Sequence, residues 1–103
     1  MSGAIPGDLF TGGSLQMVNI SGNAFGGELP ENTWRAPSLQ IFSATRCRLI
    51  GRIPGFSGCG SVYKIELSAN SLVGAIPGDV GSCQKLVTLN LRGNLLTGAI
   101  PWE

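Results

Sequence analysis

Hydrophobic and polar residues alternate in four short stretches, which follow one another along the chain at nearly equal intervals. Each stretch holds two apolar residues with one polar residue between them, namely Val18 and Ile20, Phe42 and Ala44, Ile65 and Leu67, and Leu89 and Leu91. A period of two residues is that of a β-strand with one buried face. The pattern therefore predicts four strands with these residues pointing inward, near residues 17–21, 41–45, 64–68 and 88–92.

The residues between the predicted strands repeat as well. Two further apolar columns follow the strands, at Phe25, Leu49, Leu72 and Leu96 and at Leu29, Ile53, Ile76 and Ile100. A proline ends each block, and the intervals of 24, 24, 23 and 24 residues separate Pro6, Pro30, Pro54, Pro77 and Pro101. The blocks share the pattern L-x-x-L-x-L-x-x-N-x-L-x-G-x-I-P, which is that of the leucine-rich repeat, and its ending resembles the plant-specific class.

This pattern predicts a leucine-rich-repeat solenoid of the plant-specific 24-residue type. One short parallel strand per repeat would form the concave face, and turns and short 3-10 segments would form the convex face. We expect a single solenoid fragment over residues 1–103 with about four repeats. Capping repeats normally cover the apolar ends of such a stack, and we recognise none, so we expect both ends to be uncapped.

Single residues depart from the repeat. Cys47 replaces the asparagine of the other repeats, whose side chain can pair buried backbone groups of adjacent turns, and we expect that cysteine cannot make the same bonds. Thr33 replaces an apolar residue, and we expect neighbouring Trp34 to compensate by packing. The stretch between Pro54 and Val62 is one residue short, which predicts a tighter convex turn.

Composition argues against several functional classes. Seven Lys and Arg stand against six Asp and Glu, and a net charge of +1 indicates neither a nucleic-acid surface nor a polybasic membrane patch. The chain has no histidine, no carboxylate pair at catalytic spacing and no phosphate-binding motif, so we predict no enzyme activity, no cofactor and no metal site. No apolar run approaches the ~20 residues that span a bilayer, and the first residues do not resemble a signal peptide.

The cysteines and the arginines each leave two interpretations open. Cys59 and Cys83 occupy the same repeat position, so a disulfide is possible, but we favour buried thiols because unpaired cysteine packs as a small apolar residue. Arg46, Arg48 and Arg52 fall in one repeat. These arginines could bind a carboxylate at the edge of the sheet, but we favour the interpretation that they are only solvated there. Arg46 and Arg48 stay among the candidate contacts.

Candidate partner contacts are the residues that face outward from the predicted strands, because solenoids bind partners on such surfaces. The set comprises Met17, Asn19, Ile41, Ser43, Lys64, Glu66, Thr88, Asn90 and Arg92, with Arg46 and Arg48 at the edge. Exposed methionine and isoleucine beside small hydroxyl groups favour a peptide or protein partner. Asn19 also begins the glycosylation sequon Asn-Ile-Ser, which is relevant only in a secreted protein and is otherwise a coincidence.

The segment from about Leu15 onward resembles the late ectodomain repeats of plant leucine-rich-repeat receptor-like kinases that perceive CLE peptides. The stretches LPENTW, APSLQIFSA, LIGRIP, YKIEL, NSLVGAIP and GAIPWE carry the resemblance. It implies an extracellular sensor at the plasma membrane, whose parent receptor also has a membrane span and a cytoplasmic Ser/Thr kinase. We expect neither the membrane span nor the kinase within this chain. It also implies a secreted CLE-type peptide on the concave face and a co-receptor of the somatic-embryogenesis-receptor-kinase type near the C-terminal repeats.

The same family holds the peptide's terminal carboxylate with an Arg-x-Arg pair on outward strand positions, and no outward pair here has that form. The resemblance therefore implies that these repeats lie C-terminal to the peptide anchor, nearer the co-receptor. We predict a non-catalytic protein- and peptide-binding fragment of a receptor ectodomain. Two alternatives stay open: a soluble extracellular inhibitor of cell-wall hydrolases, which uses the same repeat, and a truncated gene product without independent activity.

Overall fold

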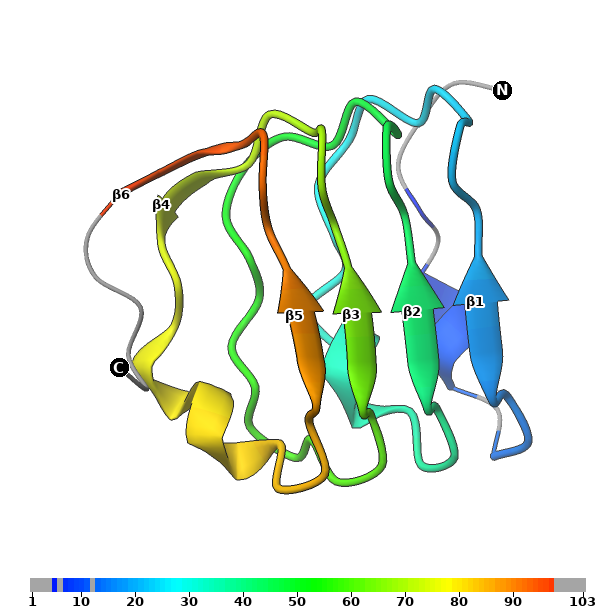
Figure 1. The fold of residues 1–103 in the computed structure, drawn as a ribbon. Helices are drawn as coiled ribbons and strands as arrows, with labels where there is room; N and C mark the ends of the chain where they lie inside the picture. The colour runs from blue at the N-terminus through cyan, green and yellow to red at the C-terminus, as the bar shows by residue number, and fades with distance from the viewer. Residues whose placement is uncertain (1–4, 6, 12, 98–103) are drawn as a thin grey trace.

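The computed structural model describes residues 5, 7–11 and 13–97, and its backbone winds so that four strands stack side by side (Figure 1). These strands form one parallel sheet in the order β1 (Met17–Asn19), β2 (Ile41–Ser43), β3 (Lys64–Glu66) and β5 (Thr88–Asn90). Val18, Phe42, Ile65 and Leu89 lie opposite one another in the register. The predicted solenoid, with one short parallel strand per repeat, is confirmed.

Each strand begins at its predicted residue and ends two residues earlier than predicted. Pairing continues past the strands through single backbone hydrogen bonds, such as those from Ile20 N–H to Ser43 C=O (2.9 Å) and from Ala44 N–H to Glu66 C=O (2.8 Å). The middle residue of each of the first three strands is buried, with 4% of Val18 and 0% of Phe42 and Ile65 exposed. The repeats therefore share one apolar layer behind the sheet.

A second, two-stranded sheet, which the sequence pattern did not predict, pairs β4 (Val73–Ala75) with β6 (Leu95–Thr97) in parallel. Isolated bridges from Glu28 to Ile50 and from Arg52 to Val73 join the corresponding segments of the earlier repeats. The alternation that marks a strand is interrupted in β4 by Gly74, a residue type that is depleted from strands. Gly74 also has a φ of +81°, which glycine adopts without strain.

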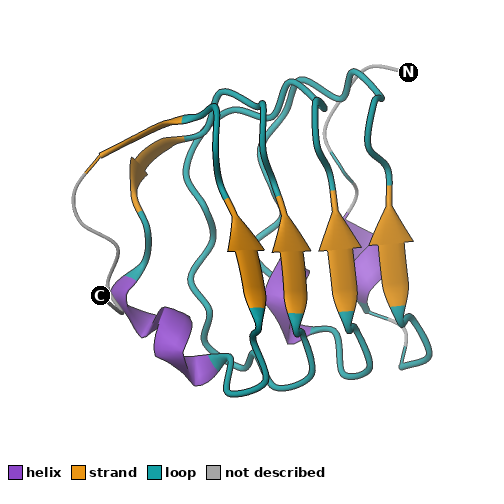
Figure 2. Ribbon diagram, in the orientation of Figure 1, coloured by secondary structure: helices purple, strands orange, loops and turns teal. Residues whose placement is uncertain are grey.

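Short 3-10 turns form the convex side of the solenoid, in agreement with the predicted fold class (Figure 2). They are η1 (Gly7–Phe10), η2 (Thr33–Arg35) and η3 (Gly78–Ser82), and each follows the proline of its repeat. The shortened repeat after Pro54 has no such turn. Over the described residues, no helical segment has both the length and the apolar character needed to cross a membrane.

The core is centred on an aromatic cluster that spans three repeats. Trp34, only 1% exposed, stacks on Phe56 with 5.4 Å between ring centroids and meets Phe42 edge-on at the same distance. Phe10 completes the cluster at 5.9 Å from Phe42. Offset and edge-on aromatic pairs at these distances add about 0.5–1.5 kcal/mol each to the free energy of burial.

Thr33 stands where the other repeats have an apolar residue, and Trp34 compensates for this change by packing, as expected. The threonine hydroxyl is fully buried and donates to Pro30 C=O at 2.6 Å, so the polar atom has a local partner. The neighbouring Trp34 indole fills the apolar space and donates its N–H to Pro54 C=O at 3.1 Å. Together the two side chains connect η2 to the backbone of its own repeat and of the next.

The asparagine column joins the backbones of successive repeats. Asn70 accepts hydrogen bonds at Oδ1 from the N–H groups of Cys47 (2.8 Å) and Leu49 (3.1 Å). Its amide nitrogen donates to the carbonyl groups of Ala44 and Leu67, both at 2.9 Å. With a further bond to Ser68 C=O at 3.2 Å, one buried amide therefore satisfies five backbone groups in two repeats.

Cys47 retains part of this role, so the prediction that it cannot make the asparagine's bonds is wrong for the donor side. Its thiol donates to Ile20 C=O at 3.1 Å, the counterpart of the bond from Asn70 to Ala44. Burial raises the pKa of this thiol, while the backbone N–H groups of Asn23 and Gly22 oppose that rise by favouring the thiolate. A thiol can replace the amide in this one bond because a single short donor reaches the carbonyl of the preceding repeat.

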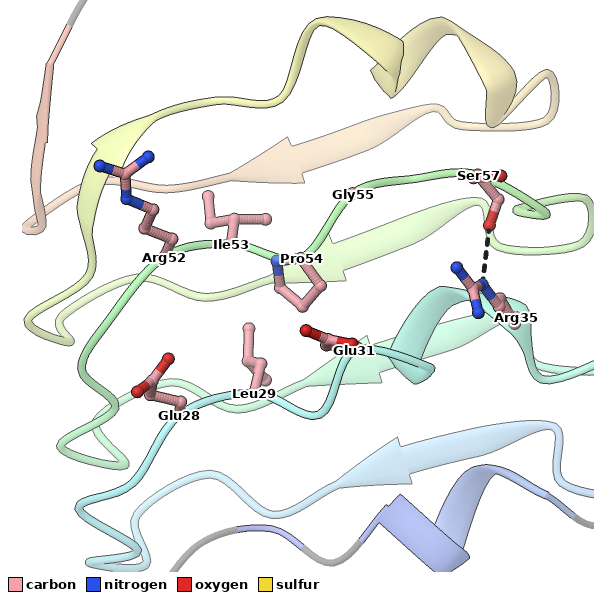
Figure 3. Close-up of a pocket in the computed structure, with 9 residues that line it drawn as sticks. All are labelled: Glu28, Leu29, Glu31, Arg35, Arg52, Ile53, Pro54, Gly55 and Ser57. Carbon is pink, nitrogen blue, oxygen red and sulfur yellow. Dashed lines mark hydrogen bonds between the residues drawn. The ribbon is translucent and has the colours of Figure 1, made fainter.

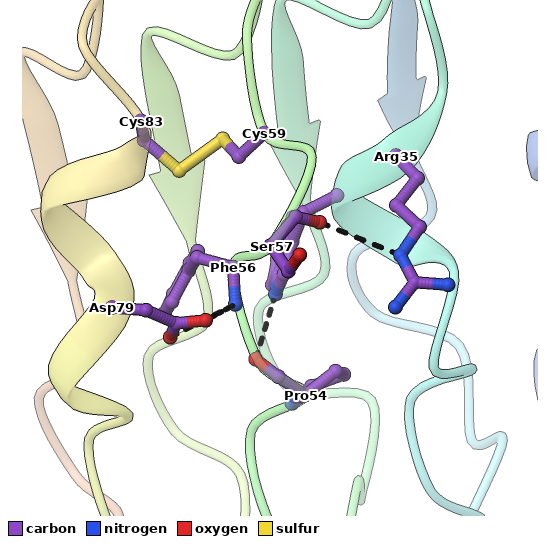
Figure 4. The surroundings of a disulfide bond; sticks show 8 residues. Arg35, Pro54, Phe56, Ser57, Cys59, Asp79 and Cys83 are labelled. Atoms are coloured by element: carbon purple, nitrogen blue, oxygen red, sulfur yellow. Dashed lines mark hydrogen bonds between the residues drawn. A yellow bond between two sulfur atoms is a disulfide. The ribbon is translucent and has the colours of Figure 1, made fainter.

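The shortened repeat obtains a hydrogen-bond partner from the repeat that follows it (Figure 4). Both carboxylate oxygens of Asp79 lie 3.1 Å from the backbone nitrogen of Phe56, two residues after Pro54. Phe56 itself remains fully buried. The convex segment can therefore lose its 3-10 turn and still satisfy its backbone and keep its core residue in place.

Cys59 and Cys83 form a disulfide, so the favoured prediction of two buried thiols is wrong (Figure 4). Their Cα atoms are 4.9 Å apart, and each residue is 5% exposed. Stacked repeats bring equivalent positions to about the spacing of paired strands, which is within the range of a disulfide. A burial pattern cannot decide the question, because thiols and a disulfide are equally suited to an apolar site.

Candidate functional site

The concave face is the outer surface of the four-stranded sheet, and it carries the candidate contacts in two aligned rows. The strand register places the first row at Met17, Ile41, Lys64 and Thr88, and the second at Asn19, Ser43, Glu66 and Asn90. All eight side chains are exposed or partly exposed. The structure therefore brings together on one surface the residues that the alternating pattern directed outward.

The chemistry of the concave face changes along the sheet. Its N-terminal half presents Met17, which is 59% exposed, beside the half-buried Ile41. Its C-terminal half is polar, with Lys64 and Glu66 on β3 and Asn90 on β5. A partner that covers the whole face would meet apolar groups at one end and charged or amide groups at the other.

Hydrogen bonds hold the polar half of this face in place. Asn90 donates from Nδ2 to Glu66 Oε1 at 3.0 Å and accepts the backbone N–H of Arg92 at Oδ1, at 3.2 Å. Hydroxyl pairs continue the pattern beyond the strands, with Ser21 and Ser43 3.0 Å apart between their oxygens. Side chains that are already ordered lose less conformational entropy when a partner binds.

Asn19, the sequon residue, is exposed on this face and accepts the backbone N–H of Ser21 at Oδ1, at 3.3 Å. A glycan on Asn19 would cover the N-terminal half of the contact surface, beside Met17. Glycosylation of Asn19 stays a prediction from the sequence.

The structure separates the three arginines that the sequence groups together. Arg46 and Arg48 lie in the turn after β2, outside both concave rows, and are exposed. Over the described residues, neither guanidinium has a hydrogen bond or an ion pair. Arg52 instead lies on the flank of the solenoid, where its backbone bridges to Val73.

That flank contains a groove of about 320 Å³, which no sequence pattern marked (Figure 3). Leu29, Ile53 and Pro54 contribute apolar surface to it, and charged side chains surround them, namely Glu28, Glu31, Arg35 and Arg52. The apolar lining residues belong to the periodic columns, whereas the charged ones stand at positions that vary between repeats, so periodicity could not reveal the groove. Over the described residues, no buried side-chain nitrogen or oxygen lacks a partner, so none is available to a ligand in this groove.

A second hollow, of about 590 Å³, lies against β5 and β6 and is more apolar than the first. Its apolar part comprises Ile76, Leu89, Leu91 and Leu96, which are only partly buried. Thr88, Asn90 and Arg92 border it. The polar contact residues therefore adjoin an apolar surface of the fourth repeat. Among the described residues, no group of three His, Cys, Asp or Glu side chains is placed to hold a metal ion.

Comparison with known proteins supports the repeat. A family model described as Leucine Rich Repeat matches residues 14–35 and 85–103. The leucine-rich repeat receptor-like protein kinase TDR of Arabidopsis thaliana is 57% identical over 48 residues, which is 47% of this chain and 5% of that protein. A crystal structure of a TDR receptor superimposes with a TM-score of 0.95 and 54% identity, covering 98% of this chain and 18% of that one.

Two complexes contain similar stacks. The BIR3–SERK2 complex from Arabidopsis thaliana matches with a TM-score of 0.89 and 34% identity, over 97% of this chain and 54% of that chain. The ectodomain of the Arabidopsis membrane receptor kinase GASSHO1/SCHENGEN3, in complex with Casparian strip integrity factor 2, matches with a TM-score of 0.90 and 34% identity, over 97% of this chain and 12% of that chain.

This chain thus spans a small part of TDR and about half of the chain in the BIR3–SERK2 complex. The repeat pattern, the parallel sheet with its convex 3-10 turns, and these likenesses agree with one another. The chain is a leucine-rich-repeat solenoid, and it resembles the ectodomains of plant receptor-like kinases.

Proposed function

We propose that this chain is a non-catalytic, protein- and peptide-binding part of a plant receptor-like kinase ectodomain. It contributes to the perception of a peptide hormone and to co-receptor docking. The observation that carries the proposal is the concave face, where two rows of outward side chains from β1, β2, β3 and β5 form one continuous surface. Its polar half is ordered by hydrogen bonds such as that between Asn90 and Glu66.

The relatives suggest the chemistry of the partners. GASSHO1/SCHENGEN3 is crystallised with a factor bound to its ectodomain, and SERK2 is crystallised in a complex with BIR3. By likeness, we assign to this chain a secreted CLE-type peptide and a co-receptor of the somatic-embryogenesis-receptor-kinase type. The parent receptor would expose these repeats outside the plasma membrane and carry a Ser/Thr kinase in another part of its chain.

The two halves of the concave face suit these two partners differently. Met17 and Ile41 offer apolar surface to a peptide side chain. Lys64, Asn90 and Arg92 offer donors to a folded protein, whose interfaces rely on pre-ordered polar groups for specificity.

The test is the double substitution Asn90→Ala and Arg92→Ala, made in the chain together with any flanking repeats that its gene encodes. We expect the affinity for the SERK2 ectodomain, measured by surface plasmon resonance, to fall about tenfold because an ordered amide and a cation are lost. Lys85→Ala, which removes one positive charge outside the concave rows, is the matched control and should change the affinity less than twofold. An unchanged affinity in the double variant would remove both residues from the contact surface.

A further inference from the structure

The turns that directly follow the four strands form a row at one end of the sheet, which we call the rim (Figure 1). The rim comprises residues 22–24, 46–48, 69–71 and 93–95. Backbone hydrogen bonds connect its turns to the neighbouring repeat, from Gly22 N–H to Thr45 C=O at 2.8 Å and from Arg46 N–H to Ser68 C=O at 3.2 Å. Positions on the rim can therefore be compared directly between repeats.

The first rim position has a positive φ in every repeat, with +83° at Gly22, +59° at Arg46, +59° at Ala69 and +73° at Gly93. Glycine adopts this conformation freely, whereas a residue with a β-carbon is strained there. Arg48 also has a positive φ, of +56°, although the equivalent residues of the other repeats do not. Two arginines within three residues therefore occupy conformations in which glycine would be relaxed.

The charge of these arginines is not balanced locally. Both side chains are exposed, and over the described residues neither has a partner. Four acidic side chains that the structure describes lie elsewhere: Glu28 and Glu31 line the flank groove, Asp79 bonds to Phe56 on the convex side, and Glu66 accepts from Asn90. In the two neighbouring repeats, the first and third rim positions are small, with Gly22, Ala24, Ala69 and Ser71, whereas the last repeat carries the exposed Leu95. The two unpaired guanidinium groups therefore lie between small side chains of the adjacent repeats.

We propose that Arg46 and Arg48 form a docking site for an acidic segment of a protein partner, separate from the concave rows. Guanidinium groups bind carboxylates through two parallel hydrogen bonds, and two of them two residues apart suit neighbouring Asp or Glu side chains. Residues in unfavourable backbone conformations concentrate at functional sites. Glycine at either position would relieve the backbone but would remove the charge. The proposal rests on the proposed protein-binding function, but it uses other residues and another chemistry.

The test uses a fluorescein-labelled hexaglutamate peptide and measures fluorescence anisotropy with the full chain at low salt. The variant Arg46→Gly with Arg48→Ser removes two positive charges from the rim. The control variant Arg35→Ser with Lys85→Ser removes two positive charges elsewhere. We expect the rim variant to bind the peptide at least tenfold more weakly and the control variant to bind within twofold of the unmodified chain.

Thermal unfolding separates a lost site from a lost fold. Because Gly22 and Gly93 already occupy the first rim position, the Arg46→Gly change should raise the melting temperature even as it weakens peptide binding. Equal losses in the rim and control variants would show that net charge alone attracts the peptide, and this would overturn the proposal. Tighter binding of dextran sulfate than of hexaglutamate, at equal charge, would overturn the assignment to a protein partner.

The Asn90→Ala, Arg92→Ala variant distinguishes this proposal from the preceding one. If that variant loses SERK2 but still binds hexaglutamate, the rim is a separate site. If it loses hexaglutamate as strongly as the rim variant does, the two surfaces act as one and a separate rim site is excluded.

Discussion

Leu67 and Leu91 occupy the same position of the repeat, just after β3 and β5, yet their surroundings differ. Leu67 is fully buried, whereas Leu91 is only partly buried and borders the apolar hollow beside β5. The inward residues two positions earlier differ in the same way, because Ile65 is fully buried and Leu89 is only partly buried. Leu67 has described repeats on both sides, and Leu91 has one on one side only. Burial in a stack is therefore set by the neighbours and not by the sequence of a repeat alone.

The stretch of coil that begins at β2 is also joined to the one that begins at β3 by bonds that the described part of the next stretch lacks. Asp79 holds the backbone of the shortened segment there, and the disulfide joins Cys59 to Cys83. At the next junction, Asn94 makes a network like that of Asn70, because it accepts Leu72 N–H at 3.0 Å and donates to Leu67 C=O at 2.9 Å, but Asn94 is only partly buried. The middle of the described stack should therefore resist unfolding more strongly than its C-terminal repeat.

The largest expected effect comes from truncating the two equivalent leucines. Leu67→Ala should lower the free energy of unfolding by about 2–5 kcal/mol, because the cavity has packed residues on every side. Leu91→Ala should cost about half of that, since part of its surface is already in contact with water. Urea unfolding followed by circular dichroism measures both. Equal losses would contradict the comparison and would mean that Leu91 is as well packed as Leu67.

Removing the disulfide should weaken the junction by a slightly smaller amount. The two cysteines are 24 residues apart, and closing a loop of that size stabilises a fold by about 3 kcal/mol. Cys59→Ala with Cys83→Ala, or reduction with dithiothreitol, should lower the melting temperature measured by calorimetry. Cys47→Ala serves as the comparison, because it removes a buried sulfur without opening a loop. A melting temperature that does not change on reduction would show that Asp79 and the apolar core hold these repeats together without the disulfide.

The smallest expected effect is a dependence of stability on pH, which arises from Cys47 in the middle of the described stack. Burial raises the pKa of Cys47, so the folded chain retains a proton that the unfolded chain loses above the ordinary value of 9.0. The unfolded state is then favoured, and stability should fall as the pH rises past 9.0. Urea unfolding between pH 7 and pH 10 should show a shallower decline for Cys47→Ser than for the natural chain. Parallel declines would assign the effect to other groups.

Periodic features of the fold could be predicted from the sequence because each repeat states them again. The strand starts, the apolar columns and the outward rows follow from a period of two residues within a repeat and about 24 residues between repeats. Trp34 was also foreseeable, since a large apolar residue beside an out-of-place threonine has one obvious position to fill.

Features that depend on a pair of repeats were harder to foresee. The sequence does not show that Asp79 reaches Phe56, or that Glu28 and Arg52 border one groove, because the partners of each pair lie one repeat apart. The strain at Arg46 and Arg48 is equally hidden, since an arginine in a turn usually indicates only exposure. The sequence leaves the disulfide between Cys59 and Cys83 open, because it shows equivalent repeat positions and burial but not oxidation.

The repeat after Pro54 is one residue shorter than the others, and this has a consequence for how such a protein can evolve. The interval between the paired residues of β2 and β3 drops to 23, yet Phe42 still faces Ile65, and the whole adjustment occurs behind the sheet. A deletion on the back of a repeat therefore leaves the recognition surface unaltered. Front and back can accumulate changes independently, so a lineage can reshape the curvature of the coil without losing its ligand, or exchange its ligand without rebuilding the coil.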